Sequence, residues 1–415
     1  MAALRSNLQA LRPVVPILIG ASIMLSLSMG LRHSLGLFMQ PLTQDVHISV
    51  SDFTLAIAVQ NLAWGFLQPV AGALTPRFGF RPIMVVGAFM YVAGLVALAT
   101  ANGLTGVMIG AGILIGASLA CTASALAMSV AARAVSAQLR SLVFGIVSAA
   151  GSLGAMIAAP IGQSLQAEYG WRIGVAGFVA LACIMIPAAW IAGRADKMPE
   201  PPPLPGGVDD RSAGQAFAAA IKNGPFMVIA IAFFVCGLQL VFLTTHLPTY
   251  LSLCGMDPML SAEALGMIGG FNVLGSLFFG WAGGRWNKLV LLGGVYILRS
   301  AVLGAYFYWP ATPATTLVFA ALMGFTWLGV IPLVAGAIAE MFGLRWQAMI
   351  QGIAFVGHQI GSFVGAFGGG LLYDALGSYD LAWRLAVATG LLAGAVQIAS
   401  ALMRPTQPPA VLAPA

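Results

Sequence analysis

The sequence predicts an all-α membrane protein whose twelve transmembrane helices form two six-helix, pseudo-symmetric bundles. Three observations lead to this fold class: an apolar composition, twelve apolar runs of membrane-spanning length, and a repeat that relates the two halves of the chain. Of the 415 residues, 60% are hydrophobic and 7% are charged, whereas soluble domains average about 45–50% and about 25%. So few charges cannot cover a water-soluble surface, which excludes a soluble enzyme, and so apolar a chain is not disordered.

The twelve apolar runs supply the predicted spans, because about 20 apolar residues cross a bilayer. They lie near residues 14–40, 51–74, 82–100, 104–130, 142–166 and 172–194 in the first half, and near 225–251, 261–283, 289–309, 314–338, 348–374 and 382–403 in the second. We assign residues 1–194 to the first bundle and 223–404 to the second. The polar, proline-rich stretch 195–222 is expected to be an extended cytoplasmic linker. The Pro/Ala-rich tail 405–415 is expected to be disordered.

Basic residues gather at one end of the predicted spans. The net charge is +6, from 18 Lys and Arg against 12 Asp and Glu. The positive-inside rule explains this balance in a membrane protein, so we expect no nucleic-acid partner. With both termini inside, the predicted cytoplasmic segments hold Arg5, Arg12, Arg77, Arg81, Arg133, Arg140, Arg194, Lys197, Arg211, Lys222, Arg285, Lys288, Arg345 and Arg404, and the outer ends hold only Arg172 and Arg384. We therefore expect a multi-pass protein of the bacterial inner (plasma) membrane with cytoplasmic N- and C-termini.

An internal repeat relates the two halves. GALTPRFGFR at 72–81 matches GWAGGRWNK at 280–288, each at the inner end of the second span of its half. LRSLVFGIVSAAGSLG at 139–154 parallels LRWQAMIQGIAFVGHQIGS at 344–362, and GWR at 170–172 parallels AWR at 382–384. Two similar halves joined by a polar loop are typical of parallel-repeat transporters.

These motifs resemble the major facilitator superfamily, whose inner-loop motif runs G-x-x-x-D-R-x-G-R-[RK]. The resemblance implies a gating motif, which the two repeat copies supply with Gly72, Arg77, Gly79, Arg81, Gly280 and Arg285. Pro76 and Gly284 replace the acidic residue of the motif. The stretches GLRHSLGLFMQP at 30–41 and GHQIGSFVGAFGGGLLYDALGSYDLAWR at 357–384 resemble bacterial carriers related to the monocarboxylate and oxalate/formate transporters. This implies a secondary transporter whose first helix lines a central cavity.

The charged and histidine side chains away from the ends of the predicted spans are basic, namely Arg32, His33, His246, Arg299 and His358. No Asp or Glu falls in the middle of a span. A charge near the bilayer centre costs several kcal/mol (roughly 3 on insertion scales) unless it faces a cavity or a partner. Such a cavity is electropositive, so it attracts a carboxylate anion, which Arg can hold through two parallel hydrogen bonds.

Each of these residues has a functional and a structural interpretation. Arg32 is the candidate anion clamp, and the alternative is an Arg that packs and reaches the outer interface. His33 lies about 100° further round the helix, so we expect it to pack, and it remains a candidate for proton coupling. His246 and His358 are candidates for substrate binding and proton coupling, although His246 could equally be a gate residue. For Arg299 we expect a structural role.

Neutral polar residues and one aromatic residue complete the candidate substrate site. Gln359 follows His358 and is expected to face the cavity. The others, each of which could instead join neighbouring helices, are Gln60, Asn61, Gln239 and Asn272. Trp327 could close over the substrate or simply pack.

We therefore predict a secondary active transporter of a small organic anion, working by proton-coupled monocarboxylate symport with alternating access. The alternatives are an anion exchanger or a proton-driven exporter of a metabolite or siderophore and, more remotely, a non-transporting membrane sensor, a membrane-embedded enzyme or a channel. The sequence has no Walker A motif, no metal-ligand spacing and no cofactor motif. We expect a monomer in the lipid bilayer with no cofactor, no metal and no enzymatic activity.

Overall fold

The computed structural model describes residues 13–199 and 202–403, and the elements in this part of the chain are helices. In chain order they are α2 (Val15–Ser34), η1 (Leu35–Phe38), α3 (Met39–Val46), α4 (Val50–Phe78), α5 (Phe80–Ala99), α6 (Leu104–Val107), η2 (Met108–Leu114), α7 (Ile115–Thr122), α8 (Ser124–Ala134), α9 (Ala137–Tyr169), α10 (Trp171–Cys183), α11 (Met185–Ala192), η3 (Gly193–Lys197), α12 (Ala213–Lys222), α13 (Gly224–Leu253), α14 (Pro258–Gly283), α15 (Lys288–Tyr308), α16 (Pro313–Thr326), α17 (Val330–Phe342), α18 (Gln347–Phe363), η4 (Val364–Gly368), α19 (Gly369–Leu376) and α20 (Asp380–Leu402).

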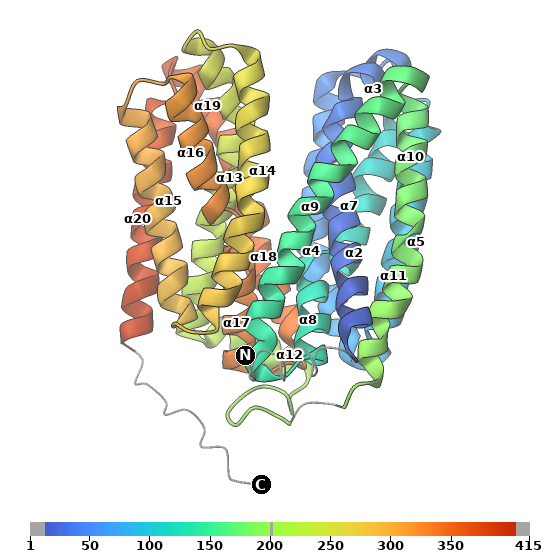
Figure 1. Ribbon diagram of the computed structural model, residues 1–415, viewed down its shortest axis with the longest axis vertical. Coiled ribbons are helices and arrows are strands. Elements are labelled where there is room, and N and C mark those ends of the chain that lie inside the picture. Colours follow the sequence, from blue (N-terminus) through green and yellow to red (C-terminus); the bar gives the residue numbers. More distant parts are fainter. Residues whose placement is uncertain (1–12, 200–201, 404–415) are drawn as a thin grey trace, which may run out of the picture.

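Figure 1 shows two groups of long helices side by side, α2–α11 and α13–α20, with α12 beneath them. We name the two ends of the molecule the α3 end and the α12 end. The predicted all-helical fold class is confirmed. In the described residues, 11 helical stretches are long and apolar enough to cross a membrane. The twelfth predicted span, 348–374, is helical as well, in α18, η4 and α19, but it is not among these 11. Polar side chains such as Gln351, His358 and Gln359 lower its hydropathy.

The linker between the two groups is partly folded, so the expectation of an extended segment is wrong for residues 213–222. Ser212 and Gln215 form a capping box at the start of α12, and this reciprocal pairing satisfies two of the free N–H groups that begin a helix. Ala216 and Ala220 are buried, which gives α12 an apolar face to pack. The predicted tail 405–415, together with Arg5, Arg12 and Arg404, lies outside the described residues.

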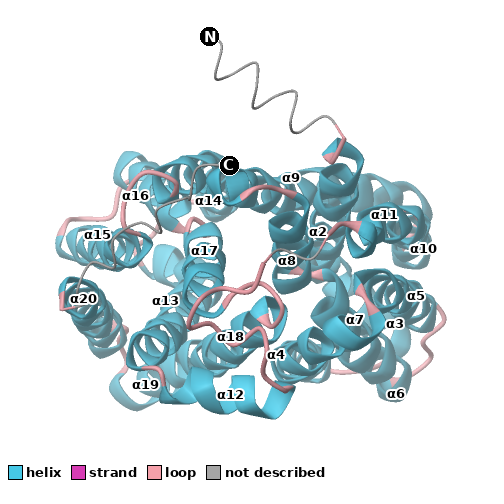
Figure 2. Ribbon diagram, turned by 90° about the horizontal axis from the view of Figure 1, so that it is seen from below, coloured by secondary structure: helices cyan, strands magenta, loops and turns pink. Residues whose placement is uncertain are grey.

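The two groups contact each other toward the α12 end, where small residues let two helix pairs approach closely. Gly145 of α9 lies against Gly280 of α14, and a methyl group on Gly145 would meet the Ser276 carbonyl oxygen at 2.7 Å. Gly72 of α4 lies against the backbone of Met349 of α18 in the same way. Figure 2 shows both pairs side by side, and Figure 1 shows the groups further apart toward the α3 end.

The fourth and the tenth predicted spans are each interrupted. The fourth is interrupted at Ala123, whose extended backbone separates α7 from α8. The tenth is interrupted between α16 and α17, around Trp327 and Gly329. A break of this kind frees backbone N–H and C=O groups, which the apolar part of a bilayer tolerates only where protein or water satisfies them.

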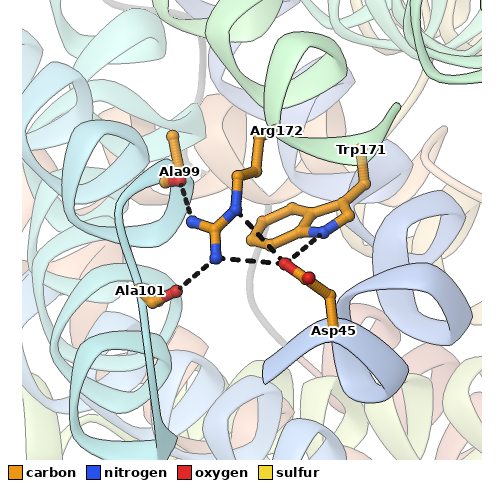
Figure 3. A network of polar contacts seen from close by, with 5 residues as sticks. All are labelled: Asp45, Ala99, Ala101, Trp171 and Arg172. Atoms are coloured by element: carbon orange, nitrogen blue, oxygen red, sulfur yellow. Dashed lines mark hydrogen bonds and ion pairs between the residues drawn. The ribbon is translucent and has the colours of Figure 1, made fainter. Parts of the chain in front are cut away.

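At the α3 end of the first group, Arg172 joins three segments (Figure 3). Its guanidinium donates to the carbonyl oxygens of Ala99 at 2.6 Å and Ala101 at 3.0 Å, and it forms an ion pair with Asp45 at 3.1 Å. The Trp171 indole donates to the same Asp45 carboxylate at 3.1 Å. Asp45 thus neutralises the charge of Arg172, and the contacts of Arg172 link α3, α10 and the end of α5.

Candidate functional site

Arg32 lies in the last turn of α2 and reaches toward α4. Its Nη2 donates to Asn61 Oδ1, and its guanidinium carbon lies 5.0 Å from the ring centroid of Trp64, a cation–π contact. Its Nε is buried and has no hydrogen-bond partner in the described part of the chain. The ion pairs found there, Arg172–Asp45 and Lys288–Glu340, do not involve Arg32, so its positive charge has no carboxylate partner in these residues.

His33, the next residue of α2, is exposed rather than packed. It has no hydrogen-bond partner among the residues that the structure describes. Gly30, three residues earlier, lies against Gly154 of α9, whereas Arg32 reaches toward α4. Gly36 lies between these two directions, at about 100° per residue, and is also exposed. His33 and Gly36 are thus both exposed beside the half-buried Arg32.

The second group meets Arg32 through α18. Gln359 Nε2 donates to the Asn61 backbone oxygen at 2.9 Å. The Trp64 ring contacts the ring of Phe355 at a centroid distance of 4.5 Å. Phe355 in turn stacks on His358 at 5.2 Å. We call this group of residues, which joins α2 and α4 to α18, the central seam: Arg32, Asn61, Trp64, Phe355, His358 and Gln359.

The central seam brings together four of the predicted site residues, Arg32, Asn61, His358 and Gln359. His358 is half-buried between α18 and α13, where its ring also contacts Phe233 edge-on at 5.1 Å.

Asn272 joins the two groups beside the break in the tenth span. Its Nδ2 donates to Ser152 Oγ of α9 at 2.9 Å, and its Oδ1 accepts from the backbone N–H of Leu328 at 2.8 Å. Trp327, in the break itself, is half-buried.

Arg299 satisfies carbonyl oxygens at the same break. Its Nη2 donates to the backbone oxygens of Thr326 and, at 3.0 Å, of Trp327, and its Nη1 donates to Cys236 Sγ at 3.1 Å. Arg299 is fully buried, with 0% of its surface exposed. A cation is favourable at the C-terminal end of α16, where the helix dipole is negative. This geometry explains the buried charge through a structural contact.

Three other predicted site residues, Gln60, Gln239 and His246, have all their hydrogen-bond partners in the described chain within their own helix group. Gln60 donates to the Ala111 backbone oxygen at 2.6 Å within the first group. Gln239 donates to Ser300 Oγ at 3.0 Å and to the Ala386 backbone oxygen at 2.8 Å within the second.

His246 is buried in the second group with both ring nitrogens engaged. Nε2 lies 2.9 Å from the Ala366 carbonyl oxygen, and Nδ1 lies 3.1 Å from Tyr379 Oη. Because a carbonyl only accepts, Nε2 carries the hydrogen and Nδ1 accepts from the tyrosine.

The comparison with known proteins decides the family. The family model described as "Major Facilitator Superfamily" matches residues 18–366. The chain belongs to the Major Facilitator Superfamily. It is a multi-pass membrane protein and a secondary transporter, not an enzyme.

Relatives and solved structures agree with this assignment. Monocarboxylate transporter 13 of Bos taurus is 27% identical over 347 residues, which cover 82% of this chain and 77% of that protein. The fucose:proton symporter FucP of E. coli is structurally similar with a TM-score of 0.71 at 16% identity, covering 92% of this chain and 98% of that one. A structure of FucP in the outward conformation gives a TM-score of 0.68 at 14% identity, with 92% and 99% covered. The chain is thus a distant relative of the monocarboxylate transporters, and its fold is that of the superfamily.

The superfamily's inner-loop motif lies at the α12 end. Arg77, Arg81 and Arg285 stack over Phe78, Trp190 and Trp281, respectively, with guanidinium carbons 5.2, 4.6 and 4.2 Å from the ring centroids.

An acid does lie beside this motif, although Pro76 replaces the acid within it. The Asp196 carboxylate accepts from the backbone N–H groups of Phe80 at 2.7 Å and Arg81 at 2.9 Å. It sits against Gly79, whose φ of 85° favours glycine. Asp196 thus accepts hydrogen bonds from two backbone N–H groups that are free at the start of α5. Gly72 and Gly280 provide the close helix contacts described above.

The two aromatic residues of the central seam, Trp64 and Phe355, are not among the predicted site residues. Trp64 and Phe355 each lie three residues from a predicted site residue, Asn61 and His358. Residues three apart share a helix face, so this spacing could have indicated both rings.

Proposed function

We propose that this transporter is a proton-coupled symporter of small monocarboxylates that works by alternating access. The observation that carries the proposal is the environment of Arg32. Its guanidinium is half-buried within a membrane span, and its hydrogen-bond acceptor in the described chain is a neutral amide. An Arg in this position gains more from a carboxylate, which accepts two parallel charge-assisted hydrogen bonds, than from one amide oxygen.

The chemistry of the surrounding residues favours a small anion. His33 and His358 are basic or neutral, and the rings of Trp64 and Phe355 offer apolar walls. The similarity to Monocarboxylate transporter 13, whose name states a monocarboxylate, supports the same substrate class.

Protons are the proposed coupling ion because an imidazole side chain can bind and release a proton. A proton on His358 or His33 would compensate for the charge of the substrate anion. One proton and one monoanion moving together transfer no net charge, so a pH gradient would drive uptake and the membrane potential would not.

The arrangement of the helices supports alternating access. The close glycine contacts hold the α12 end together, while His33 and Gly36 are exposed on the other side of the central seam. We propose that these contacts break when the site opens to the α12 end. Under the positive-inside rule the α12 end faces the cytoplasm of a bacterial cell. The bundles 1–194 and 223–404 would then move as two units of one monomer.

Uptake by purified protein in proteoliposomes tests the proposal. Radiolabelled L-lactate, pyruvate and oxalate are supplied with and without an inward proton gradient, and uncharged lactamide serves as a control of similar size. The proposal predicts saturable L-lactate or pyruvate uptake that rises with the gradient and no lactamide uptake. Uptake that needs an internal counter-anion and ignores the gradient would support the exchanger instead. No uptake of any acid would refute the carboxylate proposal.

A further inference from the structure

Asn61 makes two hydrogen bonds to other helices, one within the first bundle and one to the second bundle. Its side-chain oxygen accepts from Arg32 on α2, and its backbone oxygen accepts from Gln359 on α18. One residue of α4 therefore contacts both the candidate anion clamp and the opposite bundle. Trp64, one turn later, repeats this double contact, with Arg32 over its ring and Phe355 against it.

We infer that Asn61 is a positioning residue that holds Arg32 in the empty site and releases it to the substrate carboxylate. The inference rests on the proposed function and deepens it. An amide at this position satisfies one guanidinium N–H without neutralising the charge. An aspartate would form a permanent ion pair and exclude an anionic substrate, whereas an apolar residue would leave the N–H without a partner inside the membrane span.

Releasing Arg32 also changes the contact between the bundles. When a carboxylate binds the guanidinium, Arg32 no longer holds Asn61 and no longer needs to lie over Trp64. These two residues form the face of α4 that meets Gln359 and Phe355 of α18. Further along the same helix pair, Gly72 packs on Met349 at the α12 end. Substrate binding thereby acts on the helix pair that must separate for the site to open to that side.

Two substitutions separate this role from a purely structural one. In Asn61→Asp the introduced carboxylate competes with the substrate for Arg32. We expect the KM of Asn61→Asp for L-lactate at pH 7.5 to be at least tenfold higher than that of wild type. At pH 5, where the introduced carboxylate becomes protonated, we expect the KM of the variant to approach that of wild type measured at the same pH. In Asn61→Ala the competing acceptor is absent. We expect the KM to fall about two- to fivefold and the maximal rate to fall as well, because Arg32 no longer links the substrate to α4.

A second measurement needs no substrate. The melting temperature in detergent should be higher for Asn61→Asp than for wild type at pH 7.5, should lose this excess at pH 5, and should show no excess when Arg32→Gln is also present. Equal effects of Asn61→Asp and Asn61→Ala on KM, without a pH dependence, would overturn the inference, as would a melting excess that persists without Arg32. If wild type transports neither L-lactate nor pyruvate, the proposed function fails for these acids, and the melting series still decides whether residue 61 and Arg32 interact as inferred.

Discussion

The contact between Gly280 and Gly145 allows a direct test of how the α12 end is held closed. In Gly280→Ala the added methyl group would meet the Gly145 nitrogen at 2.7 Å and the Ser141 carbonyl oxygen at 3.0 Å. These are backbone atoms, which cannot turn away as a side chain can. Overpacking of this kind costs about 1–3 kcal/mol. Because about 1.4 kcal/mol corresponds to a factor of ten, the closed α12 end should become about 5- to 150-fold less populated.

The same helix supplies a matched control. A methyl group on Gly270, also in α14, meets no atom within 4 Å in the described structure, so Gly270→Ala should leave the equilibrium unchanged. Tyr169 and Met259 are exposed at the α3 end, one in each group. Spin labels attached to Tyr169→Cys and Met259→Cys, in a protein without its native cysteines, report the distance between the two groups at that end. We expect Gly280→Ala to shift this distance distribution to shorter values. If Gly280→Ala and Gly270→Ala both match wild type, the glycine contact does not control closure of the α12 end.

Three further substitutions test individual contacts through the melting temperature in detergent. Asp196→Ala removes the acceptor of the Phe80 and Arg81 N–H groups and should cost about 1 kcal/mol, with a smaller loss for Asp196→Asn; equal melting of Asp196→Ala and wild type would contradict the capping role. Arg299→Met removes the donors to Thr326 and Trp327 and should destabilise by about 2 kcal/mol or more, and a neutral result would refute the account of the break. The Tyr379 phenol is protonated at neutral pH, and burial raises its pKa further, so it can donate to His246. Tyr379→Phe should cost about 1 kcal/mol, and an unchanged melting temperature would show that this bond is not stabilising.

Composition and repeat sufficed to predict the fold because a bilayer restricts spanning segments to a few apolar forms. Hydropathy alone does not identify the helical segment 347–376 as a membrane span, because the seam residues His358 and Gln359 make it less apolar than the other spans. The helix in the linker was not predicted, because the whole segment 195–222 was classified by its proline-rich, polar composition. The local capping box of Ser212 and Gln215 was not considered.

The candidate site was less predictable than the fold. Rarity of charge in a membrane pointed to Arg32 and His358, and both lie in the central seam. The same criterion also selected Arg299, which contacts backbone oxygens and Cys236, and His246, which contacts a backbone oxygen and Tyr379. A sequence states that a polar group lies in a span but not which partner satisfies it. That information depends on tertiary contacts such as the one between Asn61 and Gln359.

The central claim is that Arg32 binds the carboxylate of the transported acid. The most direct measurement is the initial rate of L-lactate uptake driven by an inward proton gradient, for wild type, Arg32→Gln and Arg211→Gln. Arg211 is exposed in the linker, far along the chain from the central seam, and its replacement removes the same charge. The account predicts that Arg32→Gln abolishes uptake while Arg211→Gln retains it. Wild-type uptake by Arg32→Gln would contradict the claim, because the anion would then be held without this guanidinium.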